Sequence, residues 1–97
     1  MTLNSGLSVI SDSAFYGCAA LTSINLPETL LSIGNEAFRG CEALTTITIP
    51  IDVSFVGWYC FDGCPVLSIN AVASSLPETW NSAWNPNGRP VVWGYGT

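Results

Sequence analysis

A period of 23 residues runs through the chain and constrains its fold more than any other feature. Eight positions recur at this spacing: Ala14, Phe15, Gly17, Cys18, Leu21, Ile24, Leu26 and Pro27 reappear as Ala37, Phe38, Gly40, Cys41, Leu44, Ile47, Ile49 and Pro50. A weaker third copy holds Cys60, Phe61, Gly63, Cys64, Leu67 and Val72. A segment this short cannot bury its own apolar side chains, so successive segments must stack and share one interior.

Each repeat combines a strand pattern with a turn pattern. The stretch from Leu44 to Ile49 is rich in β-branched residues, and Pro50 then ends it because proline cannot donate to a sheet ladder. A capping Asn35 and a following Gly40 bound a short helix-compatible segment. We therefore expect an α/β solenoid of right-handed coils, with a parallel β-sheet on one face and one short helical or 3₁₀ turn per coil.

The same periodicity predicts the domain organisation. Residues 1–72 should form about three coils, together with the remnant of a preceding strand at Met1 and Leu3. Residues 73–97 contain three of the four tryptophans and should form a C-terminal cap. The chain is too short for two independent cores, so we expect both parts to share one interior.

The third repeat departs from the pattern at its strand. Asn70 falls in the column of Ile47, where an unpaired buried amide would cost roughly 1 to 3 kcal/mol. We therefore expect a bulge that turns the neighbouring Ile69 inward.

Charge and hydropathy exclude several classes of partner. Arg39 and Arg89 are the only basic residues beside seven acidic ones, giving a net charge of −5. We expect no nucleic-acid partner, because phosphate binding needs a clustered basic surface. No apolar run approaches the roughly 18 residues of a membrane span, so no membrane insertion is expected. The first six residues lack the pattern of a signal peptide, so any leader would lie upstream in a longer protein.

The repeat resembles that of the BspA-like subclass of leucine-rich repeats over roughly residues 4–72. The resemblance is carried by Ile33, Gly34, Ala37, Phe38, Gly40, Cys41, Leu44, Ile47, Ile49 and Pro50 in this order. The tail from Trp80 to Tyr95 is similar to the Trp-rich end segment of many bacterial members. The resemblance implies a C-terminal cap and a role in adhesion or protein binding. It also implies that this chain is the C-terminal fragment of a larger bacterial protein at the cell surface or secreted.

The cysteines invite a metal or disulfide interpretation that their arrangement does not favour. Cys18, Cys41 and Cys64 form one column and Cys60 lies one turn before Cys64. Zinc requires ligands that converge tetrahedrally, and the chain has no His. The separation between neighbouring coils alone would allow disulfides. However, side chains of one column point in parallel directions, which disfavours the geometry that a disulfide needs. We therefore expect four free thiols that behave as small buried hydrophobes, and no metal.

Catalytic patterns are missing from the sequence. There is no His, the carboxylates are scattered, and no phosphate loop or nucleophile elbow occurs. Leu76–Thr79 resembles the start of a sortase signal, but Trp80 follows it and Leu26–Thr29 repeats the same four letters. We expect neither an enzyme nor a cofactor.

The leading hypothesis is a protein-binding module that uses its sheet face. The outward strand residues predicted to touch a protein partner are Ser23, Asn25, Thr46, Thr48 and Ser68, together with Ala71 or, as an alternative at the same rung, Asn70. Four rungs give a face on the order of 300 Å², whereas a stable interface takes about 800 Å² per partner. The surface is therefore expected to be shared with further coils or with a second copy.

Two alternatives remain open. The chain could be a purely structural cap and spacer that ends an array. Trp80, Trp84, Trp93 and Tyr95 could instead bind carbohydrate, because aromatic faces stack on sugars. Self-association is also expected through the apolar N-terminal edge.

Overall fold

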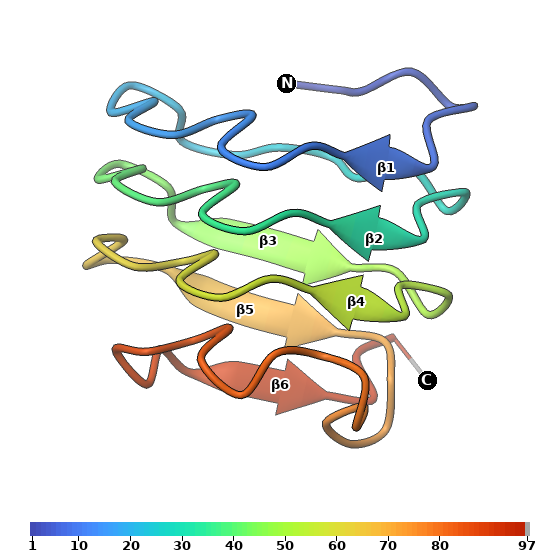
Figure 1. Ribbon diagram of the computed structural model, residues 1–97. Helices are drawn as coiled ribbons and strands as arrows, with labels where there is room; N and C mark the ends of the chain where they lie inside the picture. Colours follow the sequence, from blue (N-terminus) through green and yellow to red (C-terminus); the bar gives the residue numbers. More distant parts are fainter. Residues whose placement is uncertain (97) are drawn as a thin grey trace.

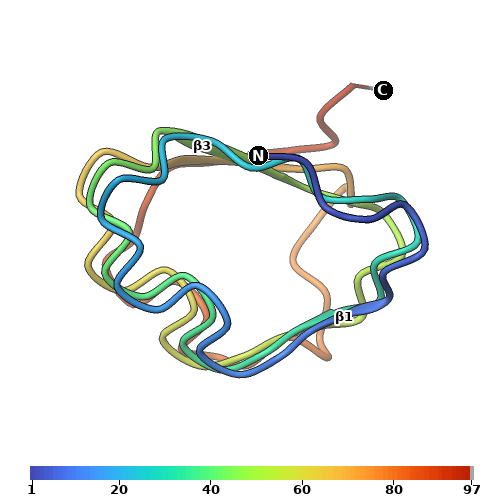
Figure 2. The ribbon, with the colours of Figure 1, turned by 90° about the horizontal axis from the view of Figure 1, so that it is seen from above.

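The computed structural model describes residues 1–96 as a right-handed stack of coils that holds two parallel three-stranded sheets (Figure 1). The first sheet contains β1 (Val9–Ile10), β2 (Ser32–Ile33) and β4 (Phe55–Val56), in that order. The second contains β3 (Thr46–Ile49), β5 (Ser68–Ala71) and β6 (Val91–Trp93). Seen along the stack, the coils superpose and the sheets lie on opposite sides of the interior (Figure 2).

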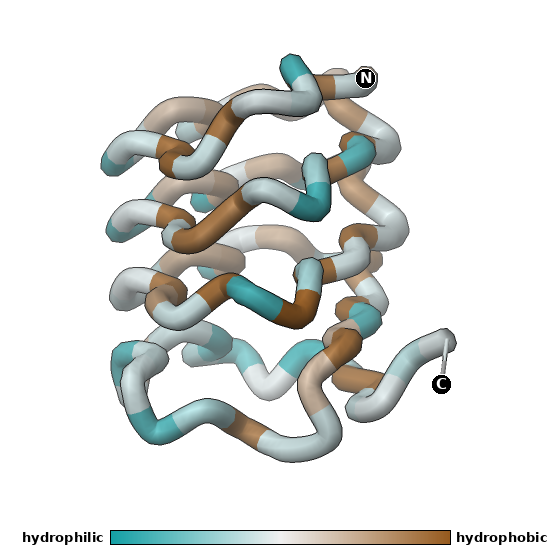
Figure 3. The backbone as a smooth tube through the Cα atoms, turned by 90° about the vertical axis from the view of Figure 1, so that its right-hand side faces the viewer, coloured by the Kyte–Doolittle hydropathy of each residue, from teal (hydrophilic) through white to brown (hydrophobic). Residues whose placement is uncertain are grey.

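The register of the first sheet shows that the 23-residue spacing is a physical alignment. Val9 pairs with Ser32, and Ser32 pairs with Phe55, each partner lying one period further along the chain. The apolar positions therefore recur at the same place in each coil (Figure 3). The sequence predicted only one sheet. The apolar column that contains Ile10 and Ile33 is the sequence feature that corresponds to the second sheet.

Stacked rings mark the centre of the core. The ring of Phe38 lies 5.2 Å from that of Phe15 and 5.7 Å from that of Phe61, with interplanar angles of 5° and 10°. Phe38 and Phe61 are completely buried, whereas Phe15 is half-buried at the N-terminal end of the stack. The shared interior expected from the repeat is confirmed.

Residues 1–96 contain no helix, so the predicted helical or 3₁₀ turn of each coil is wrong. The physical reason is a left-handed residue at the start of each expected turn, at Ser13, Glu36 and Tyr59, where φ is between 54° and 57°. Asn35 does not cap a helix. Its side-chain oxygen accepts a hydrogen bond from the N–H of Trp58 in the next coil at 3.0 Å.

Among residues 1–96, no helix could span a membrane.

The backbone-to-backbone hydrogen bonds that join neighbouring coils at this corner, formed by residues 13–17 and 36–40, all run in one direction. Backbone N–H groups of one coil donate to carbonyl groups of the following coil, as in the pairs Ser13 to Asn35, Phe15 to Ala37, Gly17 to Arg39, Glu36 to Trp58, Phe38 to Cys60 and Gly40 to Asp62. The carbonyl groups of Asp12, Ala14 and Tyr16 occupy the equivalent place in the first coil. No described residue donates to them, so this end of the corner presents three free backbone acceptors.

The third coil is one residue shorter than the two coils before it. β5 pairs with β3 at a spacing of 22 residues, with Ile47 opposite Ile69 and Ile49 opposite Ala71. The prediction that Ile69 turns inward is confirmed, since its side chain is fully buried. The predicted bulge is wrong, because pairing is continuous along β5 and the missing residue lies just before it.

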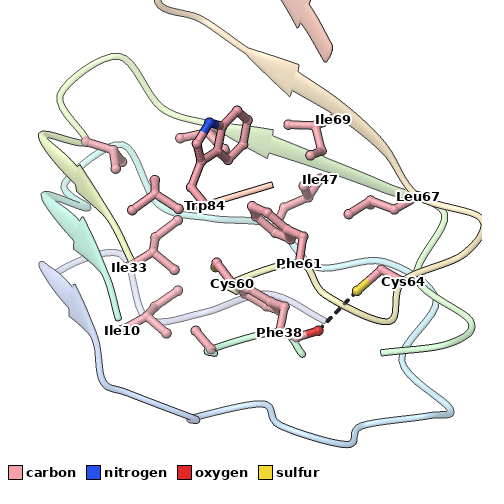
Figure 4. Close-up of a cluster of buried hydrophobic side chains, with 14 of the residues drawn as sticks. Ile10, Ile33, Phe38, Ile47, Cys60, Phe61, Cys64, Leu67, Ile69 and Trp84 are labelled. Carbon is pink, nitrogen blue, oxygen red and sulfur yellow. Dashed lines mark hydrogen bonds between the residues drawn. The ribbon is translucent and has the colours of Figure 1, made fainter. Parts of the chain in front are cut away.

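The C-terminal segment continues the stack as a divergent coil. β6 pairs in parallel with β5, so Val91, Val92 and Trp93 extend the second sheet. Trp80 and Trp84 are buried, and the ring of Trp84 meets that of Phe61 edge-on at 6.0 Å (Figure 4). Thr97, the last residue of the predicted cap, lies outside the described residues.

Candidate binding face

The outward side of the second sheet carries short polar side chains. We define the polar face as Thr2, Ser23, Asn25, Thr46, Thr48, Ser68 and Asn70. Side chains alternate across a strand, so the buried residues between these positions point into the core. Of the predicted contact residues, Ser23, Asn25, Thr46 and Ser68 are exposed, and Thr48 is half-buried.

Of the two alternatives predicted for the third rung, Asn70 belongs to this face and Ala71 does not, so the prediction of Ala71 as a contact residue is wrong. The side chain is fully buried opposite Ile49. The shorter third coil shifts the strand by one residue, which exchanges the two faces of a strand. Asn70 therefore takes the outward place, beside Thr48 and Val92.

Hydrogen bonds join neighbouring side chains of the polar face. The side-chain amide of Asn25 donates to the hydroxyl of Thr2, one repeat earlier in the chain, at 3.1 Å. The Asn70 amide lies 3.4 Å from the Thr46 hydroxyl and 3.5 Å from the Thr48 hydroxyl. These last two bonds are long and therefore weak. A ligand can replace them at small cost, and both threonine hydroxyls can still donate.

A groove of about 260 Å³ opens in the polar face between residues 23–26 and β3. Its cause is incomplete pairing. β3 pairs with β5 at four positions, but it pairs with the preceding rung only through the bridge between Ser23 and Thr46. The groove is lined by Ser23, Ile24, Asn25, Leu26, Glu28, Thr46, Ile47, Thr48, Pro50 and Val72. Four of the six predicted contact residues therefore meet at one concave site.

A second hollow of about 350 Å³ continues the groove around the ends of the strands. Glu28, Pro50 and Val72 line both hollows. The second hollow adds Thr29, Ile51 and Asp52. Sequence reasoning had found no role for Glu28 and Asp52, because nothing in the spacing showed that a groove would join them.

The two hollows combine apolar side chains with hydroxyl, amide and carboxylate groups. The first is smaller than the roughly 300 to 1,000 Å³ of typical small-molecule sites. Ile24, Leu26 and Ile47 give it an apolar part, and hydroxyl and amide groups surround them. Glu28 and Asp52 are the only ionisable side chains in the two linings. Among residues 1–96, no group of three His, Cys, Asp or Glu side chains could hold a metal ion.

A charged clamp lies at the corner of the stack, away from the grooves. The guanidinium of Arg39 forms ion pairs with Glu36 and with Asp62, the second at 3.0 Å. It also lies 6.0 Å from the ring centre of Tyr16 and 5.5 Å from that of Tyr59. The hydrogen bond with Glu36 raises the pKa of Arg39. The clamp joins residues of three coils, and no single column of the repeat predicts it.

All four cysteines are free. The thiols of Cys41 and Cys64 donate to the carbonyl groups of Phe15 and Phe38, at 3.2 and 3.1 Å. These hydrogen bonds repeat one period apart, so each of these two cysteines links its coil to the coil before it. Burial raises the pKa of the Cys60 thiol, which keeps the thiol neutral and unreactive.

The tryptophan cluster fills the end of the core. The rings of Trp80 and Trp84 lie 4.9 Å apart, nearly edge-on, and both residues are buried. The indole N–H of Trp80 donates to the carbonyl of Val53 at 3.0 Å. Two of the four residues proposed for sugar stacking therefore present no open ring face. Tyr95 is exposed, and Tyr16, Trp58 and Tyr59 are exposed near the coil corners.

Comparison with known families agrees with this architecture. The model of a family described as BspA type leucine rich repeat region (6 copies) matches residues 1–85. The match includes all of the polar face and both hollows. No curated protein and no solved structure matches the chain.

Proposed function

The chain belongs to the BspA-type leucine-rich repeat family, and from this premise we propose that it is a non-enzymatic protein-binding or adhesion module that contacts its partner through the polar face. Repeats of this family commonly serve protein binding or adhesion. The groove between residues 23–26 and β3 is the observation that carries the proposal, because it gathers Ser23, Asn25, Thr46 and Thr48 around an apolar base. Adhesion at a bacterial surface is the setting that the family suggests.

The dimensions of the site favour an extended peptide segment as the contact. A groove of about 260 Å³ receives side chains of a partner but not a folded surface. The hydroxyl and amide groups around it supply hydrogen bonds at fixed spacing along the strands, while Ile24 and Ile47 bury apolar atoms. Peptide recognition of this kind combines main-chain hydrogen bonds with pockets for side chains.

A displayed library of linear twelve-residue peptides tests the proposal. We expect the wild-type chain to enrich a set of related peptides. Thr46→Tyr places a bulky, uncharged, strand-compatible side chain beside the groove and should abolish that enrichment. Val9→Tyr makes the same kind of change at an exposed strand position of the opposite sheet and should leave it intact.

The outcome separates this function from its alternatives. Equal enrichment on both variants would place the contact elsewhere, and no enrichment on the wild type would favour the structural cap and spacer. Binding of oligosaccharides that quenches tryptophan fluorescence would favour the carbohydrate alternative.

A further inference from the structure

We infer that the continuous groove selects a partner segment with a lysine or arginine side chain, which extends along the second hollow toward Glu28 and Asp52. The inference rests on the proposed function and specifies the chemistry of the peptide. It depends on three features of the site: the path of the groove, the charges along it, and the apolar surface between them.

The two hollows adjoin, because Glu28, Pro50 and Val72 line both. The part within the polar face lies between Asn25 and Thr48, and Pro50 and Val72 continue its lining into the second hollow. Glu28 lines both parts and Asp52 lines the second. A segment held in the first hollow therefore has one adjacent side chain that reaches the carboxylates.

The charge of this path is not balanced within the described chain. Both ion pairs of residues 1–96 use Arg39, with Glu36 and Asp62 as partners. Glu28 and Asp52 are exposed, and neither takes part in an ion pair there. Arg39 and Arg89 line neither hollow. A cation is thus the charge that the second hollow lacks.

The surface between the carboxylates matches the rest of a basic side chain. Pro50, Ile51 and Val72 line the second hollow beside Glu28 and Asp52. Lysine and arginine place their methylene groups on apolar surface and keep the charged end toward water. A small metal cation would gain nothing from the apolar lining, and an acidic or purely apolar side chain would leave the carboxylates unpaired.

The peptides recovered from the displayed library provide the test. We expect a lysine or arginine at one fixed position among the peptides that Thr46→Tyr loses. One such peptide, synthesised with a fluorescent label, should bind the Glu28→Gln/Asp52→Asn double variant roughly threefold to tenfold more weakly than the wild type, as expected for exposed ion pairs.

A matched control is Glu42→Gln/Glu78→Gln, which removes two exposed carboxylates outside both hollows and should leave the affinity unchanged. Equal weakening by the two double variants would show a general charge effect and overturn the inference. Groove-dependent peptides without a fixed basic residue would overturn it while leaving the proposed function intact. If no peptide depended on Thr46, both would fall.

Discussion

The rings of Phe15 and Phe38 lie parallel, with their centres 5.2 Å apart and only 5° between their planes. This arrangement places two residues one period apart directly above each other. The last ring contact of the core is different, because Phe61 meets Trp84 at 82°. The change from stacked to edge-on rings marks where the regular repeat gives way to the divergent coil.

Truncation of the middle ring should be far more damaging than truncation of the end ring. Phe38→Ala removes a fully buried ring that packs on both sides, and we expect a loss of about 3 to 5 kcal/mol in the free energy of unfolding. Phe15→Ala should cost clearly less, because this ring is half-buried and packs on one side. Urea unfolding followed by tryptophan fluorescence measures both. Equal losses would contradict the stacked core.

Two glycines should respond to alanine for different reasons. A Cβ atom at Gly34 would lie 2.5 Å from the backbone nitrogen of Asp12, whereas one at Gly17 meets nothing within 4 Å. Gly17 has a φ of 73°, so Gly17→Ala should cost roughly 1 to 2 kcal/mol through backbone strain alone. Gly34→Ala should cost more, because two coils must separate. Thermal unfolding of the two variants would show the reverse order if coil spacing were adjustable.

The thiols should differ in their access to alkylating reagents. Cys41, Cys60 and Cys64 are buried, whereas Cys18 is half-buried at the N-terminal end. Iodoacetamide should add one group to the native chain and four to the unfolded chain, as read from the intact mass. A Cys18→Ala variant should add none while folded. Rapid modification of the other three would show that the core opens readily.

Stability should fall in alkaline solution because of Cys60. Burial raises the pKa of its thiol in the folded state, while the unfolded thiol titrates near its usual value of about 8.5. Above that pH the unfolded chain loses a proton that the folded chain keeps, so the stabilising contribution is complete below about pH 8.5 and declines above it. The slope is about 1.4 kcal/mol per pH unit. Cys60→Ala places here the residue found at Ala14 and Ala37, and should flatten the decline.

Self-association through the N-terminal end remains a prediction. Ala14 is exposed there, although Ala37 and Cys60 in the same column are fully buried. We expect reversible association that light scattering detects as a rise in mass with concentration. Ala14→Lys should suppress it by placing a charge on the open end. Ala19→Lys, at the position where the next coil has Glu42, is the control, and a strictly monomeric wild type would refute the prediction.

The sequence was sufficient wherever one period decides the structure. Coil stacking, the phenylalanine column, the four free thiols and the polar strand residues of the first two rungs all follow from side chains that repeat every 23 residues. Ile69 was also placed correctly, because a buried amide at Asn70 would have been costly. Four of the predicted contact residues line the groove of the polar face.

The errors arose where local preference and long-range pairing disagree. Asn35 and Gly40 suit a helical turn, but the left-handed backbone at Glu36 breaks it and Asn35 bonds to the next coil instead. Ala71 was assigned outward because the spacing of 23 was applied to a coil one residue shorter. The groove itself depends on how far two rungs separate, and a pattern of apolar and polar residues contains no such distance.

Because the backbone hydrogen bonds at the corner run in one direction, this architecture can lengthen or shorten only by whole coils. Duplication of a whole coil would reproduce each donor and acceptor in its proper order, whereas an insertion of any other size within the corner would leave some of them facing the wrong neighbour. The single residue missing before β5 lies after the corner, between Leu67 and Ser68, where this constraint no longer applies. Such arrays should therefore evolve by gain and loss of complete units, with irregular changes confined to the segments between corner and sheet.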